Sequence, residues 1–202
     1  MMKKIGPLVS ILFHPVLMPT LGLLLLLKSG TYLSLLNPAA KRALMFVMAL
    51  GTLLFPLMMI PILYYRKLLS SFQENSREER LIPQLIILIL YVITFVYFAR
   101  LPLSRVIHGY VLASALTLAA VLILSIRVKI CLHSAALGGM AGLIIALIFL
   151  YETPLLLLLI FALLAGGLTA SSRLAMGVQR PYEVYGGYLL GFVVLLVTLL
   201  VY

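Results

Sequence analysis

The sequence predicts an all-α protein, a bundle of six to seven transmembrane helices that forms a single integral membrane domain over residues 1–202. Hydrophobic residues make up 64% of the chain and charged residues only 10%, whereas a soluble domain carries about 25% charged residues. The mean hydropathy is +1.23. The apolar residues form continuous runs near the ~20 residues that a membrane-spanning helix needs, and a β-barrel would show short alternating segments instead.

Prolines mark the first three predicted spans. Pro15 and Pro19 lie in the first, and Pro56 and Pro61 in the second, and we expect both helices to bend because proline lacks a backbone N–H. The third span is expected to open at residue 81, which would place Pro83 in its first turn. The seven apolar runs that predict the spans cover residues 8–27, 43–65, 81–99, 105–126, 134–151, 154–171 and 184–202.

The last three apolar runs are rich in glycine. Gly138 and Gly142 are four residues apart, as are Gly187 and Gly191. This spacing allows the backbones of neighbouring membrane helices to approach closely. We therefore expect these three segments to form a tightly packed core, although the run at 134–151 is one of the two shortest and is the least certain to span the membrane.

Three polar connections are predicted to share one face of the membrane. They cover residues 66–80, 127–133 and 172–182, and two apolar runs separate each connection from the next. Because an even number of spans returns the chain to the same side, these connections and the N-terminus should lie on one face, and the C-terminus on the other.

The chain is strongly basic, with a net charge of +10. One interpretation is electrostatic anchoring to anionic lipids next to the membrane, and the other is an anionic substrate. We expect no nucleic-acid partner, because the sequence has no soluble basic module to present. The single cysteine, Cys131, cannot form an internal disulfide.

The connection before the last span carries the strongest functional signal. Arg173, Arg180 and Glu183 lie within a short stretch next to hydrocarbon, where charged groups cost several kcal/mol unless they are paired or hydrated. Arginine matches phosphate oxygens through two parallel hydrogen bonds, and lysine adds a point charge. The candidate phosphate-binding residues on the shared face are Arg77, Arg80, Lys129 and Arg173. We expect no metal site, because one histidine near one glutamate supplies too few ligands.

The spacing in this connection resembles a known signature. Ser172-Arg173 is followed by five residues, Gln179, three residues, Glu183 and then Gly186. This pattern is similar to the third signature of the type-2 phosphatidic acid phosphatase superfamily, which reads Ser-Arg-x5-His-x3-Asp with a glycine shortly after. Gln179 occupies the position of the family's nucleophilic histidine.

Two other stretches resemble the remaining signatures of this family. Ile130-Cys131-Leu132-His133 has the histidine of Pro-Ser-Gly-His before a glycine-bearing helix. Arg77, Arg80 and Pro83 resemble the signature Lys-x6-Arg-Pro. The resemblance covers residues from about 77 to 191.

The resemblance implies a lipid phosphate or lipid pyrophosphate phosphohydrolase without a cofactor, located in the inner membrane of a bacterium. Arg173 and Arg80 would clamp the phosphate, His133 would protonate the leaving oxygen, and Glu183 would orient the group at position 179. The implied substrates are phosphatidic acid, phosphatidylglycerol phosphate or polyprenyl pyrophosphate. A glutamine amide cannot form a phosphohistidine intermediate, so we expect the chain to bind such a lipid without turning it over.

Each of these residues also has a structural interpretation. Arg173 and Arg180 could be cytoplasmic anchors, His133 could bond to backbone at the interface, and Glu183 could cap its helix. The charges at 77–80 could form a solvated run. His14 and His108 are expected to be structural.

Two larger questions stay open at this point. Gln179 is either natural or a replacement of histidine. The competing function is a transporter, or a scaffold that recognises an anionic headgroup without cleaving it. The sidedness of the polar face is open as well, because removing the five candidate site cations removes the excess of positive charge on that face.

Overall fold

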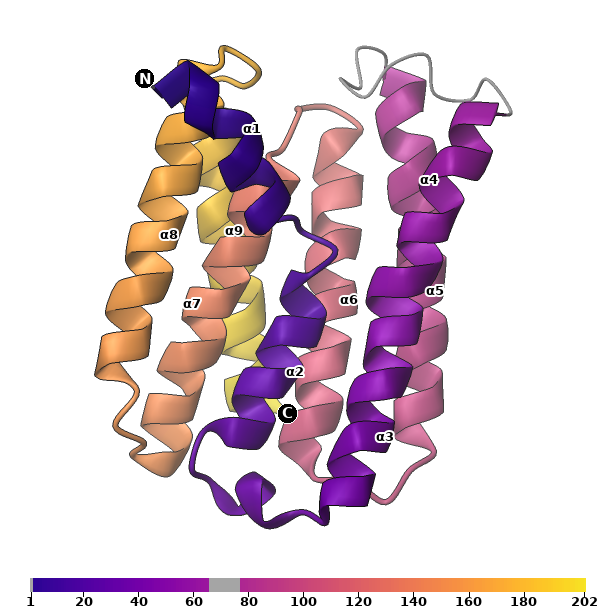
Figure 1. The fold of residues 1–202 in the computed structure, drawn as a ribbon, viewed down its shortest axis with the longest axis vertical. Helices are drawn as coiled ribbons and strands as arrows, with labels where there is room; N and C mark the ends of the chain where they lie inside the picture. The colour runs from indigo at the N-terminus through magenta and orange to yellow at the C-terminus, as the bar shows by residue number, and fades with distance from the viewer. Residues whose placement is uncertain (1, 66–76) are drawn as a thin grey trace.

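A computed structural model describes residues 2–65 and 77–202 of this chain, and every regular element in these ranges is a helix. Six helical stretches there are long and apolar enough to cross a membrane. The predicted all-α polytopic membrane bundle is therefore confirmed (Figure 1). The elements are α1 Met2–Leu12, α2 Met18–Lys28, η1 Tyr32–Leu35, α3 Pro38–Ala49, η2 Leu50–Leu54, α4 Phe55–Tyr65, α5 Arg77–Ala99, α6 Arg105–Ser125, α7 Leu132–Tyr151, α8 Leu156–Ala175 and α9 Pro181–Val201.

The apolar run at 8–27 does not form one helix, so this prediction of a single span is wrong. α1 ends at Leu12 and α2 begins at Met18, with residues 13–17 between them in turns. Pro15 has no N–H to continue the α1 hydrogen-bond ladder. Pro19 falls in the first turn of α2, where a missing N–H costs nothing. The prolines therefore break this segment instead of only bending it.

The second predicted span is continuous but irregular. α3 and α4 join through η2, a π-helical turn at Leu50–Leu54. Pro56 lies two residues after this turn and cannot donate a hydrogen bond to the carbonyl four residues earlier, that of Thr52. A π turn beside a proline is a recognised cause of a helix kink. The irregular turn therefore lies next to Pro56, one of the two prolines at which the sequence predicted a bend.

α5 begins four residues earlier than the sequence predicted. It starts at Arg77, and Pro83 lies inside the helix. The expectation that Pro83 occupies the first turn is therefore wrong. Glu and Arg are good helix formers, which explains how the polar residues 77–80 extend the helix beyond its apolar run.

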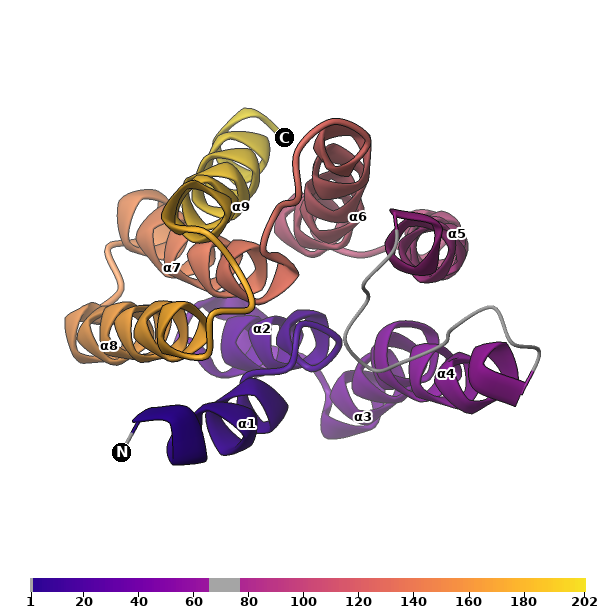
Figure 2. The ribbon, with the colours of Figure 1, turned by 90° about the horizontal axis from the view of Figure 1, so that it is seen from above.

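α7 occupies the centre of one half of the bundle. Figure 2 shows α9 on one side of α7, and α8 and α2 on the other. A Cβ placed on Gly142 would lie 2.6 Å from the carbonyl oxygen of Phe192, and one placed on Gly187 would lie 2.6 Å from that of Cys131. The predicted close packing is confirmed for α7 and α9, whereas α8 packs mainly against α7 and α1 and has little contact with α9. α7 is a full helix of 20 residues.

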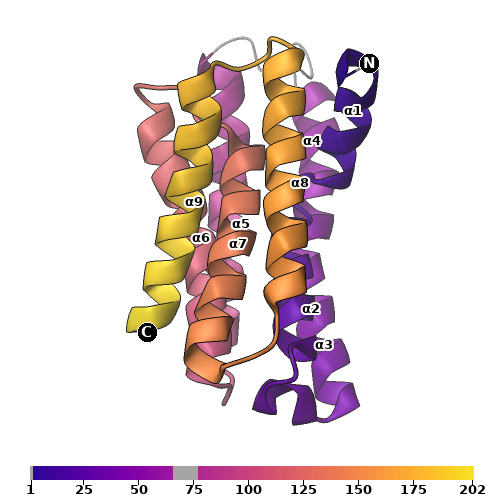
Figure 3. The same cartoon turned by 90° about the vertical axis from the view of Figure 1, so that its left-hand side faces the viewer.

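One end of the bundle, here called the polar end, is where α5, α7 and α9 begin. α1 also begins at this end, and α9 finishes at the opposite end (Figures 1 and 3). The shared placement of the connections around 127–133 and 172–182 is thus confirmed. In the remaining connection, at 66–80, residues 66–76 lie outside the described residues.

Candidate functional site

The start of α7 is tied to the start of α9. The backbone N–H of Cys131 donates to the carbonyl of Glu183 over 3.0 Å. The sulfur of Cys131 in turn caps α7 by accepting hydrogen bonds from Ser134, at 3.4 Å from the backbone N–H and 3.3 Å from the hydroxyl. Cys131 is fully buried, so its thiol serves the helix start and is not placed as a nucleophile.

The C-terminal turn of α8 presents Arg173 to the connection that follows. Gly177 adopts a positive φ of 70°, a conformation that glycine reaches without a steric penalty, and the chain turns back there. Arg173 Nε donates to Gln179 Oε1 over 3.2 Å. Lys129 Nζ, from the connection before α7, donates to the carbonyl of Val178 over 3.4 Å. The structure thus gathers Lys129, Arg173 and Gln179 at the polar end.

Glu183 acts as a helix cap in this structure. Its carboxylate Oε2 accepts the backbone N–H of Arg180 over 3.0 Å, which satisfies a donor that the first turn of α9 leaves free. The side chain is only 6% exposed. We expected Gln179 to hydrogen-bond to Glu183, but the structure pairs Gln179 with Arg173 and Glu183 with the backbone.

His133 lies beside a residue that the sequence did not assign to the site. Its ring meets the ring of His14 edge to face, with centroids 5.5 Å apart. The charge of Arg173 acts on both imidazoles, and the backbone of Ser10 interacts with His133. α1 therefore contributes Ser10 to the polar end, and the turn between α1 and α2 contributes His14.

A signal for His14 was present in the sequence. An ionisable residue inside an apolar run, followed directly by proline, marks a position where a helix is broken and a polar group must find a partner. His14 Nδ1 accepts the backbone N–H of Val16 over 3.4 Å, which is a local role. Its contact with His133 depends on how α1 lies across α8, and no local pattern encodes that.

Arg77 and Arg80 are not shown to join this cluster. Their side chains lie outside the described residues, and only the backbone of α5 is placed there. α5 begins at the polar end, but Figure 2 shows α6 between α5 and α9. Their predicted role as phosphate ligands stays a prediction.

The chemistry of the cluster favours anion binding. Within the described side chains, no carboxylate forms an ion pair with Arg173. The Glu183 carboxylate instead accepts the backbone N–H of Arg180 as a helix cap. The hydroxyl of Ser172 is fully buried and has no hydrogen-bond partner there. In the part of the chain whose side chains the structure describes, no three His, Cys, Asp or Glu residues group as a metal site requires.

Comparisons of the chain with models of protein families, with curated proteins and with solved structures found no match. The likeness to the lipid phosphatase signatures therefore rests on the residues of this sequence alone.

Proposed function

We propose that the polar end of the bundle binds the phosphate of a phosphorylated lipid and does not cleave it. The observation that carries this proposal is the hydrogen bonding of the Arg173 guanidinium. Gln179 orients its guanidinium through Nε, and a guanidinium has five N–H donors. Within the described residues, the donors on its two terminal nitrogens have no hydrogen-bond partner, and their fork geometry suits phosphate oxygens.

The neighbours of Arg173 support the same class of ligand. Lys129 adds a second positive charge beside the connection that carries Gln179. The sequence places this charge close to the hydrocarbon, where the attraction between opposite charges is stronger than in bulk water. A lipid headgroup reaches this depth from the membrane itself. We propose the inner membrane of a bacterium as the location, on the basis of the signature resemblance.

The resemblance also supports an architecture like that of a phosphohydrolase, in which the chain cannot carry out hydrolysis of the phosphate. His133 would be the general acid, and Gln179 would occupy the position of the attacking imidazole. An amide neither attacks phosphorus effectively nor carries a proton through a catalytic cycle. We therefore propose that phosphatidic acid, phosphatidylglycerol phosphate or a polyprenyl pyrophosphate binds and stays intact.

A transporter of anionic lipid is the second candidate. The observation that favours it is the break between α1 and α2, because interrupted membrane helices commonly surround the binding sites of transporters. Retention of the lipid on one side of the membrane, measured in sealed proteoliposomes, supports binding alone. Protein-dependent movement of the lipid across the membrane would favour transport.

Replacing Arg173→Ala tests the binding proposal. Losing a charge-assisted hydrogen-bond partner costs roughly 1.5–3 kcal/mol, so we expect phosphatidic acid to bind about 10- to 150-fold more weakly, as measured by calorimetric titration in detergent micelles. Arg105→Ala is the matched control, since it removes the same charge at the opposite end, where α6 begins. Equal weakening by both variants would reduce the effect to general electrostatics and contradict the proposal.

A further inference from the structure

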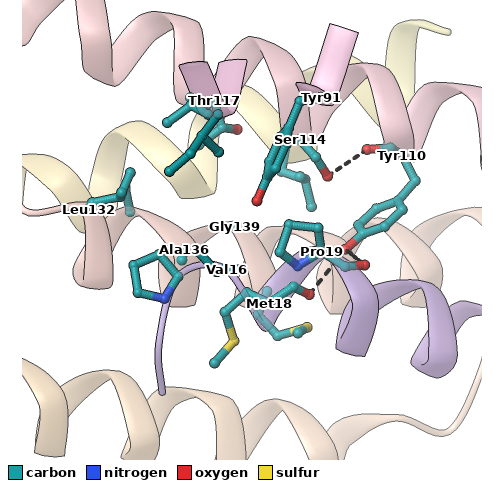
Figure 4. Close-up of a pocket in the computed structure, with 16 residues that line it drawn as sticks. Val16, Met18, Pro19, Tyr91, Tyr110, Ser114, Thr117, Leu132, Ala136 and Gly139 are labelled. Atoms are coloured by element: carbon teal, nitrogen blue, oxygen red, sulfur yellow. Dashed lines mark hydrogen bonds between the residues drawn. The ribbon is translucent and has the colours of Figure 1, made fainter. Parts of the chain in front are cut away.

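A cavity lies inside the bundle, next to the break between α1 and α2. Its volume is about 70 Å³, and its lining comes from the break itself and from α2, α5, α6, α7 and α9. Each group of the size of a water molecule needs on the order of 10–15 Å³, so about five such groups fit. Figure 4 shows Val16, Leu132, Ala136 and Gly139 around this mainly apolar space.

The cavity adjoins the cluster that holds Arg173. Pro15 lines the cavity, and the preceding residue, His14, contacts His133. Leu132 also lines the cavity, and the following residue is His133 itself. Two pairs of adjacent residues thus place the apolar space beside the cluster at the polar end.

The hydroxyl groups around the cavity are satisfied with one exception. The hydroxyl of Tyr110 donates to the carbonyl of Pro19 over 2.8 Å, and Ser114 donates to the carbonyl of Tyr110 over 2.9 Å. Thr117 donates to the carbonyl of Ala113 over 2.8 Å. Tyr91 is only 6% exposed, has no hydrogen-bond partner within the described residues, and directs its hydroxyl toward the middle of the cavity in Figure 4.

We propose that the cavity receives the ester-linked start of one acyl chain of the bound phospholipid, with the Tyr91 hydroxyl donating to the ester carbonyl. The Tyr91 hydroxyl faces the cavity, and an ester oxygen placed there would accept the hydrogen bond that this hydroxyl does not make within the described residues. The apolar walls accommodate the first carbons of the chain. This inference rests on the proposed phosphate binding and narrows its ligand to an acyl phospholipid, since a polyprenyl chain carries no carbonyl.

Filling the cavity tests whether a chain enters it. A Cβ on Gly139 would meet only ordinary contacts, at 3.7 Å from the Gly191 carbonyl and 3.8 Å from Leu195, so Gly139→Leu extends into the space. Ala136→Leu fills the same cavity from another position. Gly167→Leu is the matched control, because nothing lies within 4 Å of a Cβ there.

We expect Gly139→Leu and Ala136→Leu to weaken binding of dioleoyl phosphatidic acid at least tenfold, and to leave binding of glycerol 3-phosphate unchanged in a phosphorus NMR titration. Gly167→Leu should change neither. Thermal unfolding in detergent identifies any variant that fails to fold. Weakening of neither ligand, or equal weakening of both, would overturn a role for the chain. Failure of Arg173→Ala to weaken glycerol 3-phosphate binding would instead count against the phosphate site.

Tyr91→Phe tests the ester contact. It removes one hydroxyl and keeps the ring, so we expect roughly three- to tenfold weaker binding of ester-linked phosphatidic acid, as for the loss of one neutral hydrogen bond. Binding of the ether-linked analogue, which has no carbonyl, should not change. An equal effect on both lipids, or no effect on either, would overturn the ester contact.

Discussion

Gln179 accepts a hydrogen bond from Arg173 Nε. This bond restrains the guanidinium beside the amide. In the resembled family this position holds a histidine that attacks phosphorus. In this chain the amide orients the cation that we propose as the phosphate ligand.

Gln179→His is expected to introduce hydrolysis where the parent chain shows none. The imidazole would stand next to Arg173, the proposed site of the phosphate. Its nitrogen would attack the phosphorus as the bond to diacylglycerol breaks, with His133 protonating the leaving oxygen, and water would then cleave the phosphoenzyme to free phosphate. Adding His133→Ala should lower the new activity by about 10²–10⁴-fold, the usual contribution of a general acid. Phosphate released from phosphatidic acid is the measurement.

The control for this experiment is Gln179→Asn, which shortens the amide without supplying a nucleophile and should stay inactive. A histidine variant that folds and binds lipid but releases no phosphate would contradict the phosphohydrolase-like architecture and favour a scaffold.

The sequence predicted several residues of the site but not their partners. Lys129, Arg173 and Gln179 were expected on one face, and they lie together at the polar end. Glu183 was assigned both an orienting and a capping role, and its bond to the Arg180 backbone supports the cap. The partners of Gln179 and Glu183 depend on the turn at Gly177, whose left-handed conformation reverses the direction of the chain before these two residues. His14 was missed because its contact depends on tertiary packing.

At the scale of elements, prolines marked the irregular segments but did not determine their form. Pro15 ends α1 completely, whereas Pro56 leaves a continuous span with a π-helical turn before it. The Tyr110 hydroxyl donates to the carbonyl of Pro19, and this long-range bond holds the first turn of α2 just after the break. Such partners come from distant parts of the chain and cannot be inferred from the local sequence.

The contact between α7 and α9 gives a prediction at this scale. A Cβ on Gly191 would overlap the carbonyl of Ala135, and backbone cannot yield as a flexible side chain does. Gly191→Ala should therefore force the two helices apart and cost on the order of 1–3 kcal/mol, as overpacking does in protein cores. The free energy of unfolding in mixed micelles, measured by denaturant titration, checks this value.

Gly167→Ala is the matched control, because a Cβ there meets open space. It should be neutral or slightly stabilising, since alanine favours a helix more than glycine does. Equal effects of the two substitutions would contradict a glycine-dependent interface between α7 and α9.

At the scale of the whole molecule, hydropathy was sufficient to predict the bundle and which connections share an end. Apolar runs near the length of a membrane span dictate helices, because backbone groups in lipid must bond within their own segment. Counting spans then placed the connections around 127–133 and 172–182 together. Hydropathy could not place α1 across α8 or α6 between α5 and α9, since lateral order depends on side-chain packing (Figure 2).

The resulting molecule is asymmetric along its long axis. The polar end gathers Lys129, Arg173 and both interacting histidines, and the cavity lies directly beneath it. In the binding mode that we propose, the phosphate of the lipid lies at the basic cluster, and one acyl chain points toward the apolar cavity.

The most direct test of this account follows one lipid through binding and chemistry in a single sample. The unmodified protein is embedded in phosphatidylcholine nanodiscs with phosphatidic acid that carries a radioactive phosphate, and both retained lipid and free phosphate are counted. The account predicts saturable retention of phosphatidic acid, at least tenfold reduced by Arg173→Ala, and no phosphate release above that of empty nanodiscs. Retention equal to that of the Arg173→Ala variant, or steady release of phosphate by the unmodified chain, would contradict it.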